Sequence, residues 1–252
     1  MPFLWMLSTS LKDDQHIFVY PPQWIPAPMM FSNYPAALQY IPYGTYFLNT
    51  LQIALFATVG TVISCSLVAY SLARLHWPGR NVLFILTLAT MMLPFAVTLI
   101  PLFIVFKTLG WINTFRPLIV PAYFGSAFFI FLLRQFFLTI PVELSDAARI
   151  DGANELGIFL RIMVPLIKPA LATVALLQFL GSYRDFLGPL IYLTDNTKYT
   201  LSIGLTIYSS QHSTEWSMLM AASVVMTTPI IILFFFTQRT FVQGITLGGV
   251  KG

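Results

Sequence analysis

Charged residues and cysteine are scarce in this sequence. Only 9% of its 252 residues are charged, whereas soluble domains have roughly a quarter, and the mean hydropathy is +0.79. Cys65 is the only cysteine, which excludes an internal disulfide and the cysteine-based metal patterns. The three histidines, His16, His76 and His212, are scattered and form no HExxH motif. Water is therefore a poor solvent for this chain, and no metal site is predicted.

Motifs of catalysis and nucleotide binding are also lacking. The glycine-rich C-terminus does not have the GxxxxGK[ST] order of a phosphate-binding loop, because Lys251 is followed by Gly252. We therefore predict that this chain is not an enzyme, has no catalytic residue and holds no cofactor. The formal net charge of +4 is small, and a few arginines beside anionic lipid explain it without a nucleic-acid partner.

Long apolar segments dominate instead. A membrane-spanning helix needs about 20 mainly apolar residues, and residues 50–72, 82–106, 118–140 and 218–236 meet this requirement. A fifth segment, 170–193, is long enough but contains Arg184 and Asp185. Pro94 and Pro101 each remove a helix hydrogen bond and favour a kink in the second span. The sequence thus predicts an all-α, polytopic membrane protein with five full spans.

Residues 1–42 and 194–215 also lie outside these spans. Residues 1–7 are apolar but too short to cross a membrane, and they lack the charged start and cleavage site of a signal peptide. Residues 8–42 are polar and proline-rich, and residues 194–215 are rich in Asn, Ser, Thr, Tyr and Gln, as expected for a solvated loop or hairpin. Aromatic residues of the first outer region are expected to anchor it at the membrane interface: Trp24, Tyr34, Tyr40, Tyr43 and Tyr46.

The most informative polar segment is residues 141–169, PVELSDAARIDGANELGIFLRIMVPLIKP, which holds seven of the 22 charged side chains. Pro141 suits the first turn of a helix, where Glu143 faces the positive end of the helix dipole. Gly152 can end that helix in a left-handed conformation, and a second helix is expected to begin at Asn154. Spacings of three and four predict one face made of Leu144, Ala147, Ala148 and Asp151.

This pattern leaves two interpretations of the segment open. Small side chains such as Ala147 and Ala148 let another surface approach the helix backbone closely, which favours a docking site. The alternative is an amphipathic hairpin that lies on lipid headgroups. Pro165 and Pro169 mark the return to the membrane in either case.

Basic residues give the orientation. If the 141–169 segment is cytoplasmic, alternation of the spans places eight of the 13 basic residues on that side, as the positive-inside rule requires. These eight are Arg74, Arg80, Arg134, Arg149, Arg161, Lys168, Arg239 and Lys251. The C-terminus is then also cytoplasmic.

The run from Asp146 to Gly152, followed by Ile-Met-Val-Pro at 162–165, resembles the EAA loop of permease subunits in binding-protein-dependent ABC importers. That loop has a Glu-Ala-Ala triplet, a glycine four residues after the second alanine, and an Ile-x-Leu-Pro end. Asp146 and Val164 stand where the pattern has Glu and Leu, so charge and apolar character are kept.

Further stretches resemble the carbohydrate permeases of the maltose and glycerol-phosphate type. They are PFLWMLSTS at 2–10, ARL with PGR at 73–80, LLRQFF at 132–137 and QGITLGGVKG at 243–252. The resemblance implies the type I ABC importer transmembrane fold in a bacterial inner membrane. It divides the chain into a first helix lacking its beginning with a periplasmic segment (1–44), a transmembrane domain (45–240) and a cytoplasmic tail (241–252).

The resemblance also implies the partners and the coupling residues. The partners are a second permease subunit, an ATPase dimer that carries ATP and Mg²⁺, and a periplasmic or lipid-anchored sugar-binding protein. The first short helix of the loop would dock into the ATPase. The coupling residues carried over in this way are Glu143, Asp146, Ala147, Ala148, Gly152 and Pro165.

Tyr183, Arg184 and Asp185 are candidates for the translocation path. A charge at bilayer depth costs about 2.5 to 3.5 kcal/mol on insertion scales, so both charged residues must face protein or water. Tyr183 offers a ring and a hydroxyl to a sugar. A structural contact with a second permease is the alternative, and the family usually has Trp-Asn where this chain has Tyr183-Arg184.

The function predicted from these features is that of a permease subunit in an ATP-driven carbohydrate importer that works by alternating access. An ion-coupled secondary transporter is one alternative, but Asp185 would be its only buried carboxylate. A membrane-anchored interaction protein is another, and it leaves Arg184 and Asp185 without a role.

Overall fold

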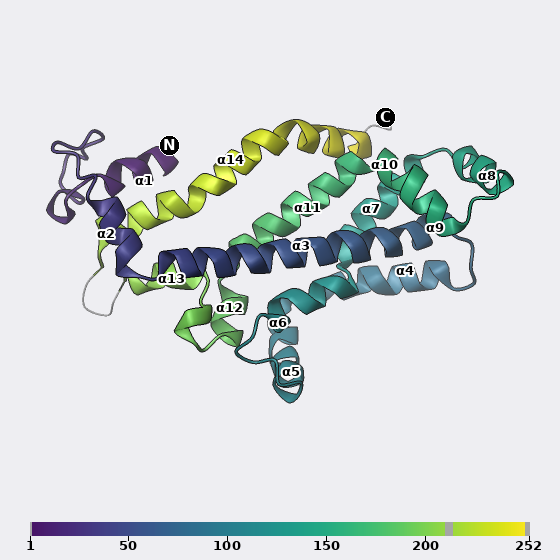
Figure 1. Cartoon of the computed structure of the whole chain (residues 1–252), viewed down its shortest axis with the longest axis horizontal. Helices are drawn as coiled ribbons and strands as arrows, with labels where there is room; N and C mark the ends of the chain where they lie inside the picture. The colour runs from purple at the N-terminus through teal and green to yellow at the C-terminus, as the bar shows by residue number, and fades with distance from the viewer. Residues whose placement is uncertain (1, 210–213, 250–252) are drawn as a thin grey trace. The chain divides into compact units, whose positions relative to one another are not determined.

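The structure is a computed structural model that describes residues 2–209 and 214–249, with side chains described up to residue 238. Within these ranges every regular element is a helix, and the one β-type pairing is an isolated bridge between Ser209 and Thr214. Figure 1 shows these helices as coiled ribbons. The predicted all-α fold is confirmed.

The chain forms two compact units, each of which combines two separate stretches of sequence. Unit 1 consists of Met1–Gln52 and Tyr183–Phe235, and unit 2 consists of Ile53–Ser182 and Phe236–Gly252. These contact-based units do not follow the predicted boundaries after residues 44 and 240, and that division stays a prediction.

Unit 2 contains most of the helices. Its longer helices are α3 (Tyr43–Arg74, from residue 53 onward), α4 (Arg80–Ala89), α5 (Phe95–Thr108), α7 (Ala127–Thr139), α8 (Glu143–Ile150) and α11 (Lys168–Tyr183). Shorter helical elements connect them: η2 (Thr90–Met92), α6 (Arg116–Ile119), η3 (Val120–Phe124), α9 (Glu155–Ile158), η4 (Phe159–Met163) and α10 (Val164–Leu166).

Within the residues that the structure describes, three helical stretches are long and apolar enough to cross a membrane by themselves: Tyr43–Arg74, Arg116–Thr139 and Trp216–Gln238. Two further helix pairs meet the same criterion but are bent, Arg80–Met92 with Phe95–Thr108 by 101° and Glu155–Leu166 with Lys168–Tyr183 by 80°. If each bent pair is one span, the number is the predicted five. The predicted bounds of the fifth span, 170–193, are corrected. Its helix ends at Tyr183, and the other half of the bent pair is Glu155–Leu166, which precedes it in the sequence.

The two prolines in the second predicted span have different positions in the structure. The bend of 101° lies where Pro94 precedes α5 in an extended conformation, with φ −62° and ψ 140°. Leu93 before it is also extended, as expected for a residue that precedes proline. Pro101 lies inside α5, and the helix continues through it to Thr108. The prediction of a break was therefore right for Pro94, and Pro101 does not interrupt its helix.

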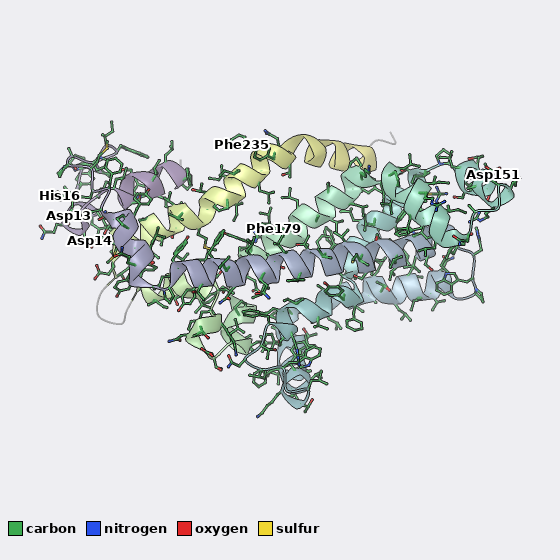
Figure 2. All side chains as sticks on the ribbon, viewed as in Figure 1. Asp13, Asp14, His16, Asp151, Phe179 and Phe235 are labelled. Atoms are coloured by element: carbon green, nitrogen blue, oxygen red, sulfur yellow. The ribbon has the colours of Figure 1, made fainter. Side chains whose placement is uncertain are left out.

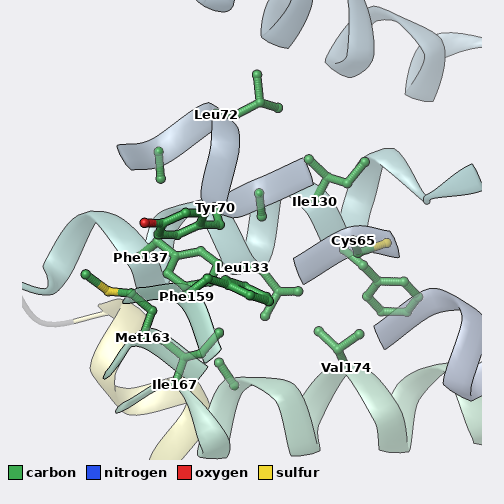
Figure 3. Close-up of a cluster of buried hydrophobic side chains, with 14 of the residues drawn as sticks. Cys65, Tyr70, Leu72, Ile130, Leu133, Phe137, Phe159, Met163, Ile167 and Val174 are labelled. Atoms are coloured by element: carbon green, nitrogen blue, oxygen red, sulfur yellow. The ribbon is translucent and has the colours of Figure 1, made fainter. Parts of the chain in front are cut away.

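The core of unit 2 is packed around aromatic rings (Figure 3). Tyr70 from α3, Phe137 from α7 and Phe159 from η4 form a triangle with ring centroids 5.2 to 6.4 Å apart. Such separations are typical of stabilising aromatic pairs. Other buried members include Cys65, Leu133, Met163 and Val174.

Unit 1 contains α1 (Pro2–Ser10), η1 (Asp14–His16), α2 (Asn33–Tyr40), α12 (Leu187–Tyr192), η5 (Asn196–Lys198), α13 (Leu201–Ile207) and the first part of α14 (Trp216–Gly249). Figure 2 labels Asp13, Asp14 and His16 near its N-terminal end. The Tyr43 hydroxyl donates to the Ala222 carbonyl at 3.2 Å, and the Tyr208 hydroxyl donates to the Ala37 carbonyl at 2.7 Å.

Two sequence expectations for this unit were wrong. Residues 194–215 were expected to be a solvated loop, yet α13 lies within them and buries Leu201 and Ile203. Tyr43 and Tyr46 were expected at the membrane interface and are buried instead. Gly204 explains the close packing, because a Cβ atom there would lie 2.6 Å from the Tyr46 ring.

Candidate functional site: the charged loop and the broken helix

The 141–169 segment folds into two short helices around a glycine, as the sequence predicts. α8 ends at Ile150, and Gly152 has a left-handed φ of 82°. The Gly152 amide donates to the Arg149 carbonyl at 3.1 Å, and the Ala153 amide donates to the Ala148 carbonyl at 2.9 Å. This pair of bonds is a Schellman motif, which requires a left-handed residue at the position of Gly152. Figure 2 marks Asp151 in this turn.

The second helix begins with a side-chain cap. Asn154 is extended, and its Oδ1 atom accepts a hydrogen bond from the Gly157 amide at 2.7 Å. Such a cap satisfies one of the free amides in the first helical turn. Pro141 precedes α8 by two residues, so it does not lie in the first turn as predicted.

Arg149 forms one ionic hydrogen bond within α8 and a second one that joins α8 to α9. Arg149 donates from Nη1 to Asp146 Oδ1 at 2.7 Å and from Nε to Glu155 Oε1 at 2.8 Å. The bond to Glu155 is the main cause that raises the pKa of the Arg149 guanidinium. These groups are partly exposed, so each pair contributes at most about 1 kcal/mol. Their effect is geometric, because one guanidinium fixes the angle between α8 and α9.

The loop is also tied to the long helix α3. The Tyr70 hydroxyl donates to Glu155 Oε2 at 2.8 Å, so Glu155 joins Tyr70 to Arg149. Arg74, one turn further along α3, donates to the carbonyls of Ile140 and Pro141, where α7 ends and the loop begins. The apolar residues Ile158, Phe159 and Met163 then enter the core (Figure 3). The loop is therefore a braced projection rather than a free connection.

The return to the membrane is irregular. Residues Phe159–Met163 form a π-helical turn, and Pro165 follows in the first turn of α10. Proline cannot donate a backbone hydrogen bond, and π turns occur where a helical ladder is locally disrupted. The predicted coupling residue Pro165 thus lies at the bend of 80° that separates the loop from α11.

The exposed face of α8 differs from the predicted one. Ala148 is only 8% exposed and belongs to the core of unit 2, and Ser145 is buried beside it. Ala147, Leu144 and Ile150 are exposed, Ile150 to 86%. The predicted grouping of Ala147 with Ala148 on one face is therefore corrected, because Ala148 packs inward. Glu143 and Asp146 are exposed.

The three candidates for the translocation path lie where a helix is interrupted. α11 ends at Tyr183, residues 184–186 are not helical, and α12 begins at Leu187. Tyr183 is buried, and its hydroxyl donates to the Met226 carbonyl at 3.1 Å. Arg184 is exposed, and Asp185 is half-buried with Oδ1 accepting from the Gly188 amide at 3.2 Å. The predicted span 170–193 contains Arg184 and Asp185, and in the structure both residues lie outside its helices.

This interruption gives Asp185 a structural role. Its carboxylate satisfies a free amide at the start of α12, as an N-terminal cap does. In transporters, broken helices of this kind are found where substrate and ion sites form. The arrangement therefore combines a capped half-helix with an exposed cation, Arg184.

Sequence reasoning missed Tyr70 and Ser145. Tyr70 precedes Glu155 by 85 residues in the sequence and lies in an apolar helix. No local sequence pattern indicates that it contacts the loop. The burial of Ser145 could not be predicted from the sequence, because it depends on how α8 packs against the core.

Taken together, these features define a polytopic helical membrane protein with a rigid, charged helical projection and a broken helix. The family model of the binding-protein-dependent transport system inner membrane component matches residues 63–247. That match covers well over half of the chain, which therefore belongs to this family and is an inner-membrane component of such a transport system.

Several characterised proteins are similar over most of their length. The arabinooligosaccharides transport system permease protein AraQ of Halalkalibacterium halodurans is 43% identical over 83% of this chain and 75% of its own. The trehalose/maltose transport system permease protein MalG of Thermococcus litoralis is 31% identical over 100% of this chain and 91% of its own. A bacterial ABC transporter involved in the import of the acidic polysaccharide alginate contains a chain with a TM-score of 0.85 at 25% identity, over 95% of this chain and 90% of that one.

Proposed function

We propose that this chain is a permease subunit of an ATP-driven importer that moves a sugar or sugar derivative across the membrane by alternating access. Its family membership supports the transport role, and the names of its relatives support a carbohydrate as the substrate. The observation that carries the coupling part of the proposal is α8, a short helix with an exposed apolar face on a braced loop.

In this mechanism α8 docks into an ATPase subunit, which binds ATP and Mg²⁺. Leu144, Ala147 and Ile150 form the contact face, because they are exposed and lie three residues apart. Arg149 and Gly152 hold the helix at a fixed angle, and Glu155 passes movement of α8 to Tyr70 on α3. Closure of an ATPase dimer would thereby move the spans.

The other partners follow from the same role. A second permease subunit would complete the path, and a periplasmic or lipid-anchored sugar-binding protein would deliver the substrate. The excess of arginine and lysine in the loops around α8 supports a cytoplasmic position for this loop and for the C-terminus. Residues 194–215 would then face the binding protein.

The translocation path is proposed to pass the break between α11 and α12. Arg184 is exposed there and offers five N–H donors to the hydroxyls of a sugar. Asp185 offers the carboxylate lone pairs that the Gly188 and Leu187 amides do not use. Tyr183 is buried and would support this break from behind rather than contact the sugar directly.

An Ala147→Arg substitution is expected to weaken association with the ATPase at least tenfold. Its long charged side chain would stand on the exposed face of α8 and keep the partner from the helix backbone, while membrane insertion stays intact. Co-purification of the two proteins from detergent over a range of ATPase concentrations measures the effect. The control is Asn196→Arg, the addition of the same charge at an exposed residue of η5. Equal association of Ala147→Arg and the native chain would refute the docking face.

Ala148→Arg does not test the same point, although sequence alone would select it. Because Ala148 is buried in the core of unit 2, arginine there would disturb the subunit itself. Loss of association in that variant would not separate docking from folding.

Substitutions of Asp185 separate its capping role from a role in the path. Asparagine keeps an oxygen that can accept from the Gly188 amide, so Asp185→Asn should keep its stability, whereas Asp185→Ala should lose about 1 kcal/mol. Unfolding in detergent measures both. Transport by the assembled complex is expected to fall several-fold in Asp185→Asn because the charge is gone. Native transport in this variant would exclude the carboxylate from the path.

A further inference from the structure

The loop between α3 and α4 and the first turn of α4 border an open hollow that the transport mechanism does not use. Residues 76–82 line this hollow, which has a volume of ≈ 460 Å³. The side chains that surround it are His76, Trp77, Pro78, Arg80, Asn81 and Val82. It lies in unit 2, where α3 ends next to the start of the 141–169 segment, because Arg74 binds the Ile140 carbonyl. The hollow is thus at the same end of unit 2 as the start of the 141–169 segment.

Two arginines without acidic partners lie beside this hollow. Arg80 and Phe84 are on one face of α4, four residues apart, and the Arg134 guanidinium lies over the Phe84 ring at 4.1 Å. Arg134 is thereby placed within one helical turn of Arg80. Among the residues whose side chains are described, no carboxylate lies within 4.0 Å of either guanidinium.

Both arginines keep free donors. Arg80 donates one N–H to the Leu75 carbonyl at 2.8 Å, and Arg134 donates one to the Leu72 carbonyl at 3.2 Å. A guanidinium has five N–H groups, so several on each remain for an anion with more than one oxygen. A phosphate group fits this need, because arginine binds phosphate through paired hydrogen bonds.

The surroundings indicate that the phosphate carries acyl chains. α4 begins at Arg80, so its first turn forms part of the lining, and it exposes Val82, Leu83, Ile85 and Leu86. Trp77 is half-buried, with its Nε1–H bonded to Ser71 Oγ at 3.2 Å. Tryptophan at this position is typical of the boundary between headgroups and acyl chains. A cationic hollow next to an apolar helix face complements a lipid better than it complements a soluble anion.

We propose that the hollow at residues 76–82, together with Arg80 and Arg134, binds the headgroup of an anionic glycerophospholipid whose acyl chains lie along α4. The proposal rests on the proposed orientation only for the choice of leaflet, which is the cytoplasmic one. Anionic lipids attract basic residues at that surface. Binding would reduce the repulsion between the positive charges of Arg80 and Arg134 near the start of the 141–169 segment.

Quenching of Trp77 fluorescence by brominated lipid tests this site. The full chain, without any ATPase, is placed in phosphatidylcholine bilayers that contain increasing fractions of phosphatidylglycerol brominated on its acyl chains. The signal of a Trp77→Phe chain is subtracted at each step. The native chain is expected to reach half-maximal quenching at a phosphatidylglycerol fraction about fivefold lower than Arg80→Gln does. The reason is that one basic residue near an anionic surface strengthens binding by about fivefold. Arg80→Lys should stay closer to the native chain.

Two comparisons decide the outcome. The double variant Lys107→Gln with Arg116→Gln removes two positive charges at exposed residues elsewhere and should quench as the native chain does. Equal quenching by brominated phosphatidylcholine, or an equal loss in that double variant, would overturn the proposal. Displacement of the lipid by millimolar inorganic phosphate would show a site for a free anion and would also overturn it. Because no ATPase is present, failure here leaves the coupling proposal unaffected.

Discussion

A chain with Gly152→Val is expected to bind the ATPase about 5- to 140-fold more weakly than the native chain. Gly152 has a φ of 82°, and a β-branched residue is strained there by about 1 to 3 kcal/mol, where each 1.4 kcal/mol is tenfold in binding. The substitution would open the Schellman motif and release α8 from its fixed angle. Co-purification and ATP-driven uptake into vesicles are the measurements.

Two matched variants show whether the backbone of the loop is the cause. Gly152→Asn should recover most of the association, because asparagine tolerates the left-handed region. Gly110→Val puts the same residue at another glycine with positive φ, 67°, and at both positions a Cβ atom would meet no other atom within 4 Å. Full association of Gly152→Val would mean that α8 does not need this turn. A loss in Gly110→Val as large as in Gly152→Val would point to general destabilisation.

Phe137→Ala is expected to lower the free energy of unfolding by about 3 to 5 kcal/mol. Phe137 is fully buried and contacts the rings of both Tyr70 and Phe159. Alanine would leave a cavity between α3, α7 and η4, and these elements are too well braced to close it. Unfolding of the chain in mixed micelles, at increasing fractions of a denaturing detergent, measures the loss.

The control for this substitution is Phe124→Ala. Phe124 is 81% exposed at the end of η3, so its removal should change stability by less than about 0.5 kcal/mol. Equal losses in the two variants would mean that the aromatic triangle does not carry the stability of unit 2.

Sequence alone predicted the helical class, the approximate spans and the two-helix form of the charged loop. These rest on local signals: apolar length for the spans, and the glycine and asparagine at 152 and 154 for the turn. The break at Pro94 was predictable because proline restricts the conformation of the residue directly before it, which is a local effect. Pro101 shows the limit, because only the surrounding structure decides whether a helix continues through a proline.

Burial was harder to predict than secondary structure. In a sequence that is 57% hydrophobic, apolar spacing does not separate a side chain that faces lipid from one that faces protein. The inward turn of Ala148 and the burial of Tyr43 depend on contacts between distant segments. The same holds for Asp185, whose position after the end of α11 could not be read from its neighbours.

The exposure of Ile150 has a consequence for the supply of this subunit. Ile150 is 86% exposed and lies with the exposed Leu144 on α8, and in the proposed complex the ATPase covers both side chains. In a cell that produces more of this chain than of its partner, the surplus chains would therefore keep this apolar face exposed although they are folded. Proteases and chaperones that bind apolar side chains could remove the surplus, and the subunits would be kept in balanced numbers without any control of their synthesis.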